Sequence, residues 1–222
     1  MAQLLYDRQS TAVHLSACGR HIRLCRQVPG TETLVAAIEP LFLALQGKQA
    51  QTRQTLWDRQ AAYDSVQLAD ALLDDKVRTL FERGKQYDRE NPGRPVVMQL
   101  FPDEKFSTVV NAPLVKEPDL VEQLKQRLEN LGADHPLYPL AEPLGQAVAA
   151  VRNALAAYQN AITTLKSKEA EEEIAQANLR RQFEFNYYDA MRLFGKNFAQ
   201  RLFPVFITPE NREEEPAAPP VV

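Results

Sequence analysis

The chain has 222 residues, of which 45% are hydrophobic and 25% charged, and its formal net charge is −3. These values are typical of a folded globular protein, and the slight acidity argues against a general nucleic-acid-binding protein, which would be basic. Because no apolar run approaches the ~20 residues of a membrane span, no secretory signal is visible and the two cysteines make no disulfide framework, we expect a cytoplasmic protein.

The first predicted element is a β-hairpin within residues 11–28. Apolar residues alternate with polar ones on both sides of Gly19-Arg20: Val13, Leu15 and Ala17 before it, Ile22 and Leu24 after it. A period of two is the pattern of a strand, and a loop that begins with glycine suits a tight turn. Pro29-Gly30 then ends the unit.

An isolated two-stranded hairpin is only marginally stable in water, so we expect this one to need a partner. Residues 205–208, which follow the second helical segment, could add a strand, and so could a neighbouring subunit. The residues predicted to form such an interface are apolar and lie in these two regions: Val13, Leu15, Ile22, Leu24, Phe203 and Phe206.

Both cysteines and two of the three histidines lie close together in this segment, as His14, Cys18, His21 and Cys25. Such side chains are the common ligands of zinc. On a helix all four would share one face, whereas on the hairpin they would form two pairs about 13 Å apart, at ~3.3 Å per residue. One ion cannot bind both pairs, so a metal or redox site would require a second chain; the alternative is that these are structural residues.

The first long segment opens at Ile38-Glu39-Pro40-Leu41 and closes at Leu100-Phe101-Pro102, after a start that Thr31 or Thr33 could cap. A seam with alternating spacings of three and four predicts a helix that packs along most of its length. The seam residues are Ile38, Phe42, Leu45, Gln49, Thr52, Leu56, Arg59, Tyr63, Val66, Asp70, Leu73, Val77 and Leu80. A single helix from about residue 40 to 88 fits the unbroken seam, and a helical hairpin that turns near Asp64-Ser65 fits the usual helix lengths.

Residues 92–118 form a proline-rich connector. Pro118 then begins a short helix that Gly132 ends, because proline suits the first turn and glycine the residue after the last. Its apolar stripe consists of Leu120, Val121, Leu124, Leu128 and Leu131. We expect this amphipathic helix to cover the end of a helical bundle.

The second long segment repeats the layout of the first. It opens at Ala141-Glu142-Pro143-Leu144 and closes at Leu202-Phe203-Pro204, and Phe183-Glu184 lies 102 positions after Phe81-Glu82. The seam continues with Leu144, Val148, Val151, Leu155, Tyr158, Ile162, Leu165, Leu179, Phe183, Ala190 and Leu193, interrupted by a polar stretch at 166–173. We infer an internal duplication in which the two long helical units pack antiparallel.

The predicted fold is therefore mainly α: two long antiparallel helical units in a bundle or coiled-coil arrangement, with a small N-terminal β-hairpin. The predicted divisions are residues 1–30 for the hairpin, 31–102 and 137–208 for the helical repeats, 103–136 for the connector, and 209–222 for an acidic, proline-rich tail.

No nucleophile elbow, phosphate-binding glycine loop or metalloprotease motif occurs in the sequence, so we expect no enzyme and no cofactor. The paired helices and the unpartnered hairpin favour a non-enzymatic structural or scaffolding subunit that forms a homo-oligomer or joins other protein subunits, without nucleic acid or a membrane span. The alternative is a small binding module, for a metal at the His/Cys segment or for a ligand between the helices.

Overall fold

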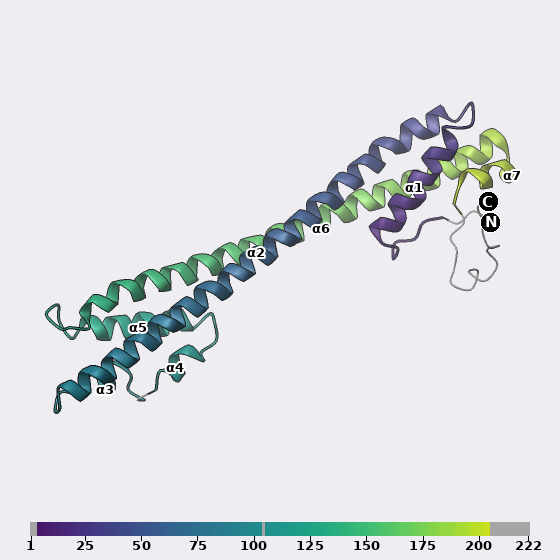
Figure 1. Cartoon of the computed structure of the whole chain (residues 1–222). Helices are drawn as coiled ribbons and strands as arrows, with labels where there is room; N and C mark the ends of the chain where they lie inside the picture. Colours follow the sequence, from purple (N-terminus) through teal and green to yellow (C-terminus); the bar gives the residue numbers. More distant parts are fainter. Residues whose placement is uncertain (1–3, 104, 205–222) are drawn as a thin grey trace, which may run out of the picture. The chain divides into compact units, whose positions relative to one another are not determined.

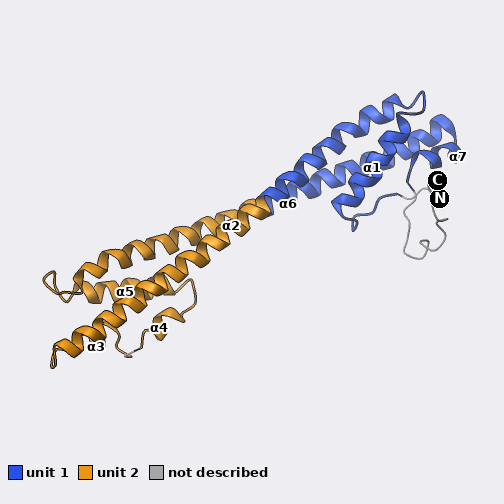
Figure 2. Ribbon diagram, in the orientation of Figure 1, with its two compact units in different colours: residues 1–54, 166–222 blue, residues 55–165 orange. Residues whose placement is uncertain are grey.

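The computed structural model describes residues 4–103 and 105–204, and in these ranges every regular element is a helix (Figure 1). The α-helices are α1 (Thr11–Cys25), α2 (Glu32–Glu90), α3 (Val97–Leu100), α4 (Ser107–Val110), α5 (Glu117–Glu129), α6 (Ala141–Phe194) and α7 (Lys196–Ala199). Two 3₁₀ turns, Tyr138–Leu140 and Gln200–Leu202, precede α6 and follow α7. The chain divides into unit 1, residues 1–54 and 166–222, and unit 2, residues 55–165 (Figure 2).

The prediction of an N-terminal β-hairpin was wrong, because residues 11–25 form the helix α1. The residues that α1 buries recur at helical spacing, and they are His14, Ala17, Cys18, Gly19, His21, Ile22 and Cys25. Much of this buried face is histidine and cysteine, which the alternation argument had counted as polar. Gly19 makes no turn: it lies within α1, and a Cβ there would make an ordinary contact with the Phe42 ring at 3.5 Å.

Each long segment is one continuous helix, so the prediction of a single helix is confirmed over that of a helical hairpin. Helix α2 begins earlier than predicted, and its Pro40 lies inside the helix. The predicted seam is buried near both ends of α2, at Ile38 and Leu45 and again from Leu73 to Leu80. Between them Val66 is also buried, whereas Leu56 is 46% exposed.

In unit 1, α1 packs beside the first part of α2 and the last part of α6 (Figures 1 and 2). The two long helices are antiparallel here, since Lys48 pairs with Glu171 at 2.6 Å and Thr52 donates to the carbonyl of Lys168. The core joins residues from α1, α2, α6 and the segment after α6; it includes Cys18, Ile22, Leu34, Ile38, Leu45, Leu179, Phe183, Leu202 and Phe203.

In unit 2, α5 packs with α3 and α4, and its apolar stripe joins the core as predicted. The 3₁₀ turn and α6 follow Gly132, whose positive φ of 95° suits the turn after α5. This core includes Leu73, Val77, Leu80, Phe81, Leu100, Phe101, Val121, Leu124, Leu128, Leu144, Val148 and Val151.

The two units contain equivalent contacts at positions 102 apart in the long helices. Phe81 meets Phe101 edge-on with ring centroids 5.2 Å apart, and Phe183 meets Phe203 edge-on at 5.0 Å. Each unit contains a short helix and the first part of the long helix that follows it in the chain. Each unit also contains the last part of the other long helix and the Leu-Phe-Pro segment that comes after it.

No helix in the described part of the chain is long and apolar enough to cross a membrane. The predicted tail, residues 209–222, and the predicted strand at 205–208 lie outside the described residues.

Candidate interaction surface

The histidines and cysteines of α1 lie inside unit 1. His14, Cys18 and His21 have no exposed surface, and Cys25 is 1% exposed. Burial raises the pKa of both thiols, that of Cys25 to about 11, so both are held as neutral thiols.

His21 is at the centre of a hydrogen-bonded network. Its Nδ1 lies 2.9 Å from the carbonyl oxygen of Leu202, which can only accept, so Nδ1 carries the proton. Its Nε2 then accepts from Nδ2 of Asn186 at 3.0 Å, and the same amide donates to the carbonyl of Leu34. The imidazole also stacks on Phe203 at 4.2 Å. Burial lowers the pKa of His21, and the bond to Leu202 partly offsets this.

These positions are unsuited to the metal site that the sequence suggested between two chains. Both ring nitrogens of His21 are engaged in hydrogen bonds, and a second chain cannot reach buried side chains on α1. Within residues 4–103 and 105–204, no group of three or more His, Cys, Asp or Glu residues is placed to hold a metal ion.

The residues predicted to form an interface lie against the core of unit 1 wherever the structure describes them. Ile22 and Phe203 are 5% and 3% exposed, whereas Val13, Leu15 and Leu24 are partly buried against the same core. Phe206 lies outside the described residues. The apolar surface that is open to a partner therefore has to be found elsewhere.

Unit 2 carries an exposed apolar groove between α2 and α6. Its volume is about 650 Å³, and it is lined by Ser65, Leu68, Ala69, Leu72 and Lys76 of α2 and by Pro143, Gln146, Ala147 and Ala150 of α6. Leu68 is 63% exposed and Leu72 52%. Because large apolar side chains open to water are costly when they gather in one place, this groove is the strongest candidate for a binding surface.

Trp57 is a further large apolar side chain exposed on α2. It is 67% exposed, and it lies 11 residues, or about three helical turns, before Leu68, so the two side chains share a face of the helix. Tryptophan is enriched at the centres of protein interfaces. We call Trp57, Leu68 and Leu72 together with Ala147 and Ala150 the apolar face.

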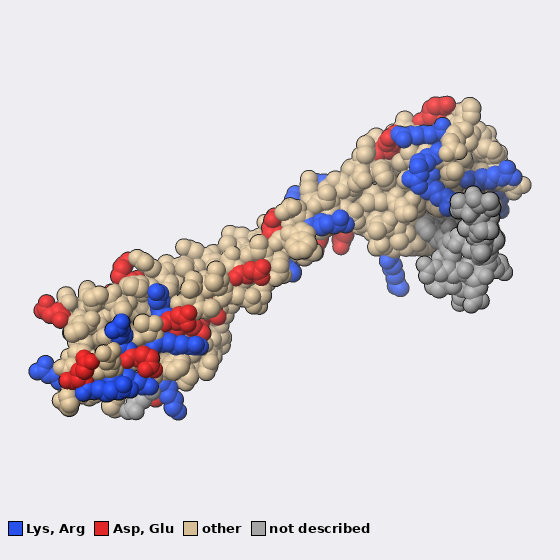
Figure 3. All heavy atoms as spheres, in the orientation of Figure 1, with Lys and Arg blue, Asp and Glu red and all other residues tan. Residues whose placement is uncertain are grey.

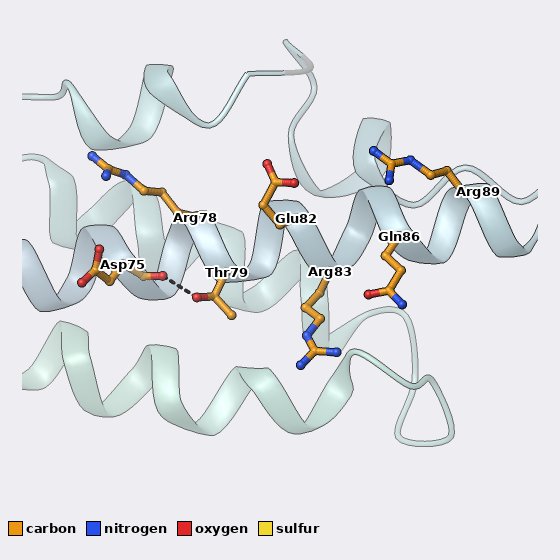
Figure 4. Close-up of a pocket in the computed structure, with 7 residues that line it drawn as sticks. All are labelled: Asp75, Arg78, Thr79, Glu82, Arg83, Gln86 and Arg89. Atoms are coloured by element: carbon orange, nitrogen blue, oxygen red, sulfur yellow. Dashed lines mark hydrogen bonds between the residues drawn. The ribbon is translucent and has the colours of Figure 1, made fainter.

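A second hollow, of about 670 Å³, lies along α2 in unit 2, but its side chains do not converge. It is lined by Asp75, Arg78, Thr79, Glu82, Arg83, Gln86 and Arg89, all from one helix, and Arg78 and Arg83 point away from each other (Figure 4). Acidic and basic side chains are also interspersed over the visible face of unit 2 (Figure 3). This arrangement does not build the convergent positive site that a phosphate would need.

Three carboxyl groups meet where α5 begins. Glu117 is 2% exposed, and it lies against Asp70 and Asp74 of α2, which are one helical turn apart. Asp70 lies in the predicted helical seam, whereas Glu117 was not among the predicted site residues. The only signal was an acidic residue directly before Pro118, which is common in the first turn of any helix.

Comparison with models of protein families, with curated proteins and with solved structures gave no match for this chain.

Proposed function

We propose that this protein is a non-enzymatic structural subunit that self-associates through the apolar face of unit 2. The observation that carries the proposal is the exposure of Leu68 and Leu72 beside the small side chains of Ala147 and Ala150. We also infer that the chain arose by internal duplication, since its two repeats contribute equivalent pieces to both units.

A second copy of the chain suits this face because the face offers both halves of a helix contact. The leucines of α2 are large and protrude, while the alanines of α6 leave room. When a two-fold axis relates two copies, the leucines of one copy oppose the alanines of the other, so one surface is complementary to itself. Leucines that insert between small residues are the basis of close helix packing.

The test is the molar mass of the full chain by light scattering over a range of concentrations, for the wild type and for Leu68→Gln with Leu72→Gln. Glutamine keeps a high helix propensity, so the helix is retained while the apolar surface is lost. The matched control is Leu193→Gln, which removes a leucine that is 51% exposed on α6 in unit 1. We expect association in the wild type and the control, and a monomer in the double variant.

Trp57 supplies a second measurement in the same samples. Its indole is exposed in the single chain, so its fluorescence should shift to shorter wavelength as the wild type associates, and should stay unchanged in the double variant. A wild type that remains monomeric at every concentration would contradict self-association. In that case the groove would be better explained as a site for a small apolar ligand, since its volume is within the range of such sites.

A further inference from the structure

The start of α5 buries a carboxyl group that has no donor. Oε1 of Glu117 and Oδ1 of both Asp70 and Asp74 are buried, and none has a hydrogen-bond partner among the described residues. An ionised carboxylate can only accept hydrogen bonds, so three ionised carboxyl groups cannot satisfy one another. A proton on one of them would turn that group into a donor.

Unit 1 shows how the corresponding site is satisfied. Thr11 lies 106 positions before Glu117, at the start of α1, and Glu172 and Gln176 lie 102 positions after Asp70 and Asp74. The hydroxyl of Thr11 is 2.6 Å from Oε1 of Glu172 and 3.3 Å from Oε1 of Gln176. In this unit the short helix therefore donates a hydrogen bond to a carboxylate of the long helix.

We propose that Glu117 is protonated in the folded protein and donates its hydrogen bond to Asp70 or Asp74, which makes the packing of α5 in unit 2 dependent on pH. The hydroxyl of the protonated acid takes the role that the hydroxyl of Thr11 has in unit 1. This inference is independent of the proposed self-association, because the carboxyl groups are not part of the apolar face.

The surrounding charges favour this state. The elements packed against α5 include α3 and α4, which contain no titratable residue, and α2, whose Arg78 lies 3.9 Å from Asp74 with a side chain 56% exposed. Arg152 of α6 pairs instead with the exposed Asp119 and the partly exposed Glu122. Burial, with hydrogen bonding and repulsion from Asp70 and then Asp74, raises the pKa of Glu117 to about 9.

High pH should destabilise unit 2, because folding raises the pKa of Glu117 above its ordinary value. Between the ordinary pKa of 4.5 and about 9, the folded chain holds a proton on Glu117 that the unfolded chain has lost. Stability therefore falls as pH rises through this window, and the unfolding constant of unit 2 increases by up to about tenfold per pH unit. Below the window both states hold the proton and the effect disappears.

The direct test is the carboxyl ¹³C chemical shift of Glu117 in the full chain, followed from about pH 4 to about pH 10. The signal is assigned by its loss in Glu117→Gln. Glutamine keeps the shape of the side chain, and its amide N–H donates a hydrogen bond at every pH. We expect a midpoint several units above that of an ordinary glutamate. A midpoint near the ordinary value would overturn the proposal.

The second test is hydrogen exchange of α5 in the full chain at about pH 5 and about pH 8, corrected for intrinsic rates and compared at each pH with α5 of Glu117→Gln. Wild-type α5 should lose protection at the higher pH, and α5 of Glu117→Gln should not. Glu122→Gln, at a partly exposed carboxyl on the same helix that pairs with Arg152, should behave as the wild type.

Two results would overturn the proton assignment. One is an identical pH dependence of α5 in the wild type and in Glu117→Gln. The other is stabilisation of the wild type, but not of Glu117→Gln, by millimolar Mg²⁺ or Ca²⁺ at constant pH, because a divalent cation would then be the species that the three carboxyl groups bind.

Discussion

His21 and Arg127 have the same role in the two units. Nδ1 of His21 on α1 donates to the carbonyl of Leu202 at 2.9 Å, and Nη1 of Arg127 on α5 donates to the carbonyl of Leu100 at 3.1 Å. The two donors are 106 positions apart and the two acceptors 102. Different chemical groups thus attach each short helix to the Leu-Phe-Pro segment that closes its unit.

Removal of the donor in unit 2 should destabilise that unit. In Arg127→Ala the carbonyl of Leu100, which belongs to a fully buried residue, loses its charged donor, and the expected cost is roughly 1–3 kcal/mol. The control is Arg152→Ala, which removes only partly exposed ion pairs and should cost about 1 kcal/mol or less. Urea midpoints at neutral pH measure both. Equal costs would mean that the bond to Leu100 contributes nothing specific.

Acid should destabilise unit 1 through His21. Burial lowers the pKa of this imidazole, so the unfolded chain takes up a proton that the folded chain resists as pH falls below about 6.5. Protonation would also set a cation against the donating amide of Asn186. We expect the protection of α1 against hydrogen exchange, corrected for intrinsic rates, to fall between about pH 7 and about pH 5. Unchanged protection of α1 in that range would contradict this role.

The phenylalanines at corresponding positions should each support their own unit. Phe81→Ala and Phe183→Ala both leave a cavity in a core where a second phenylalanine meets the ring edge-on, so each should cost roughly 3–5 kcal/mol. Hydrogen exchange by mass spectrometry should place the loss of protection of Phe81→Ala mainly in α5, and that of Phe183→Ala mainly in α1. The exposed Phe185→Ala, at 53%, is the control and should change neither.

The pH dependence proposed for unit 2 should be transferable to unit 1. In Thr11→Glu a carboxyl group replaces the hydroxyl that donates to Glu172, and so recreates the arrangement of Glu117. We expect α1 to lose protection as pH rises above about 5, which is a dependence that the wild-type helix lacks at this position. Thr11→Gln should not acquire this pH dependence, because its amide N–H donates a hydrogen bond at every pH. If both variants responded alike, the cause would be side-chain size and not charge.

The helical architecture could be predicted largely from the sequence, because the long seams carry a strong period. Leu73, Val77 and Leu80 lie in such a seam, and all three are fully buried. The short helix α5 could also be predicted, since Pro118 and Gly132 mark its ends. Such signals are local, so one sequence suffices to read them.

Helix α1 was misread because its buried face is chemically mixed. His14, Cys18 and His21 are buried, yet a binary division into apolar and polar residues excludes them from the core. What remained, Val13, Leu15 and Ala17, alternates like a strand. His21 is satisfied there by Asn186 and the carbonyl of Leu202, which lie more than 160 positions away, so no local pattern could reveal its burial.

The carboxyl cluster could not be predicted from the sequence for a similar reason. Asp70 and Asp74 look like the polar interruptions that every surface helix carries, and Glu117 looks like an ordinary first-turn acid. Only the packing of α5 brings them together. The exposed leucines of the apolar face were not predicted either, because a seam pattern indicates which residues a helix buries and not which ones it leaves exposed.

The division of the chain between the units has a consequence for its synthesis. Unit 2 is one uninterrupted stretch, residues 55–165, so all of it has left the ribosome before the chain is finished. Unit 1 joins residues from both ends, and α1 meets the carbonyl that it needs only when Leu202 has been added. Since domains generally fold as they emerge and distant contacts form slowly, unit 2 is expected to fold first on the ribosome. During that interval the cysteines of α1 are still without the burial that later makes them unreactive, so the nascent chain has a period of thiol exposure that the finished protein does not.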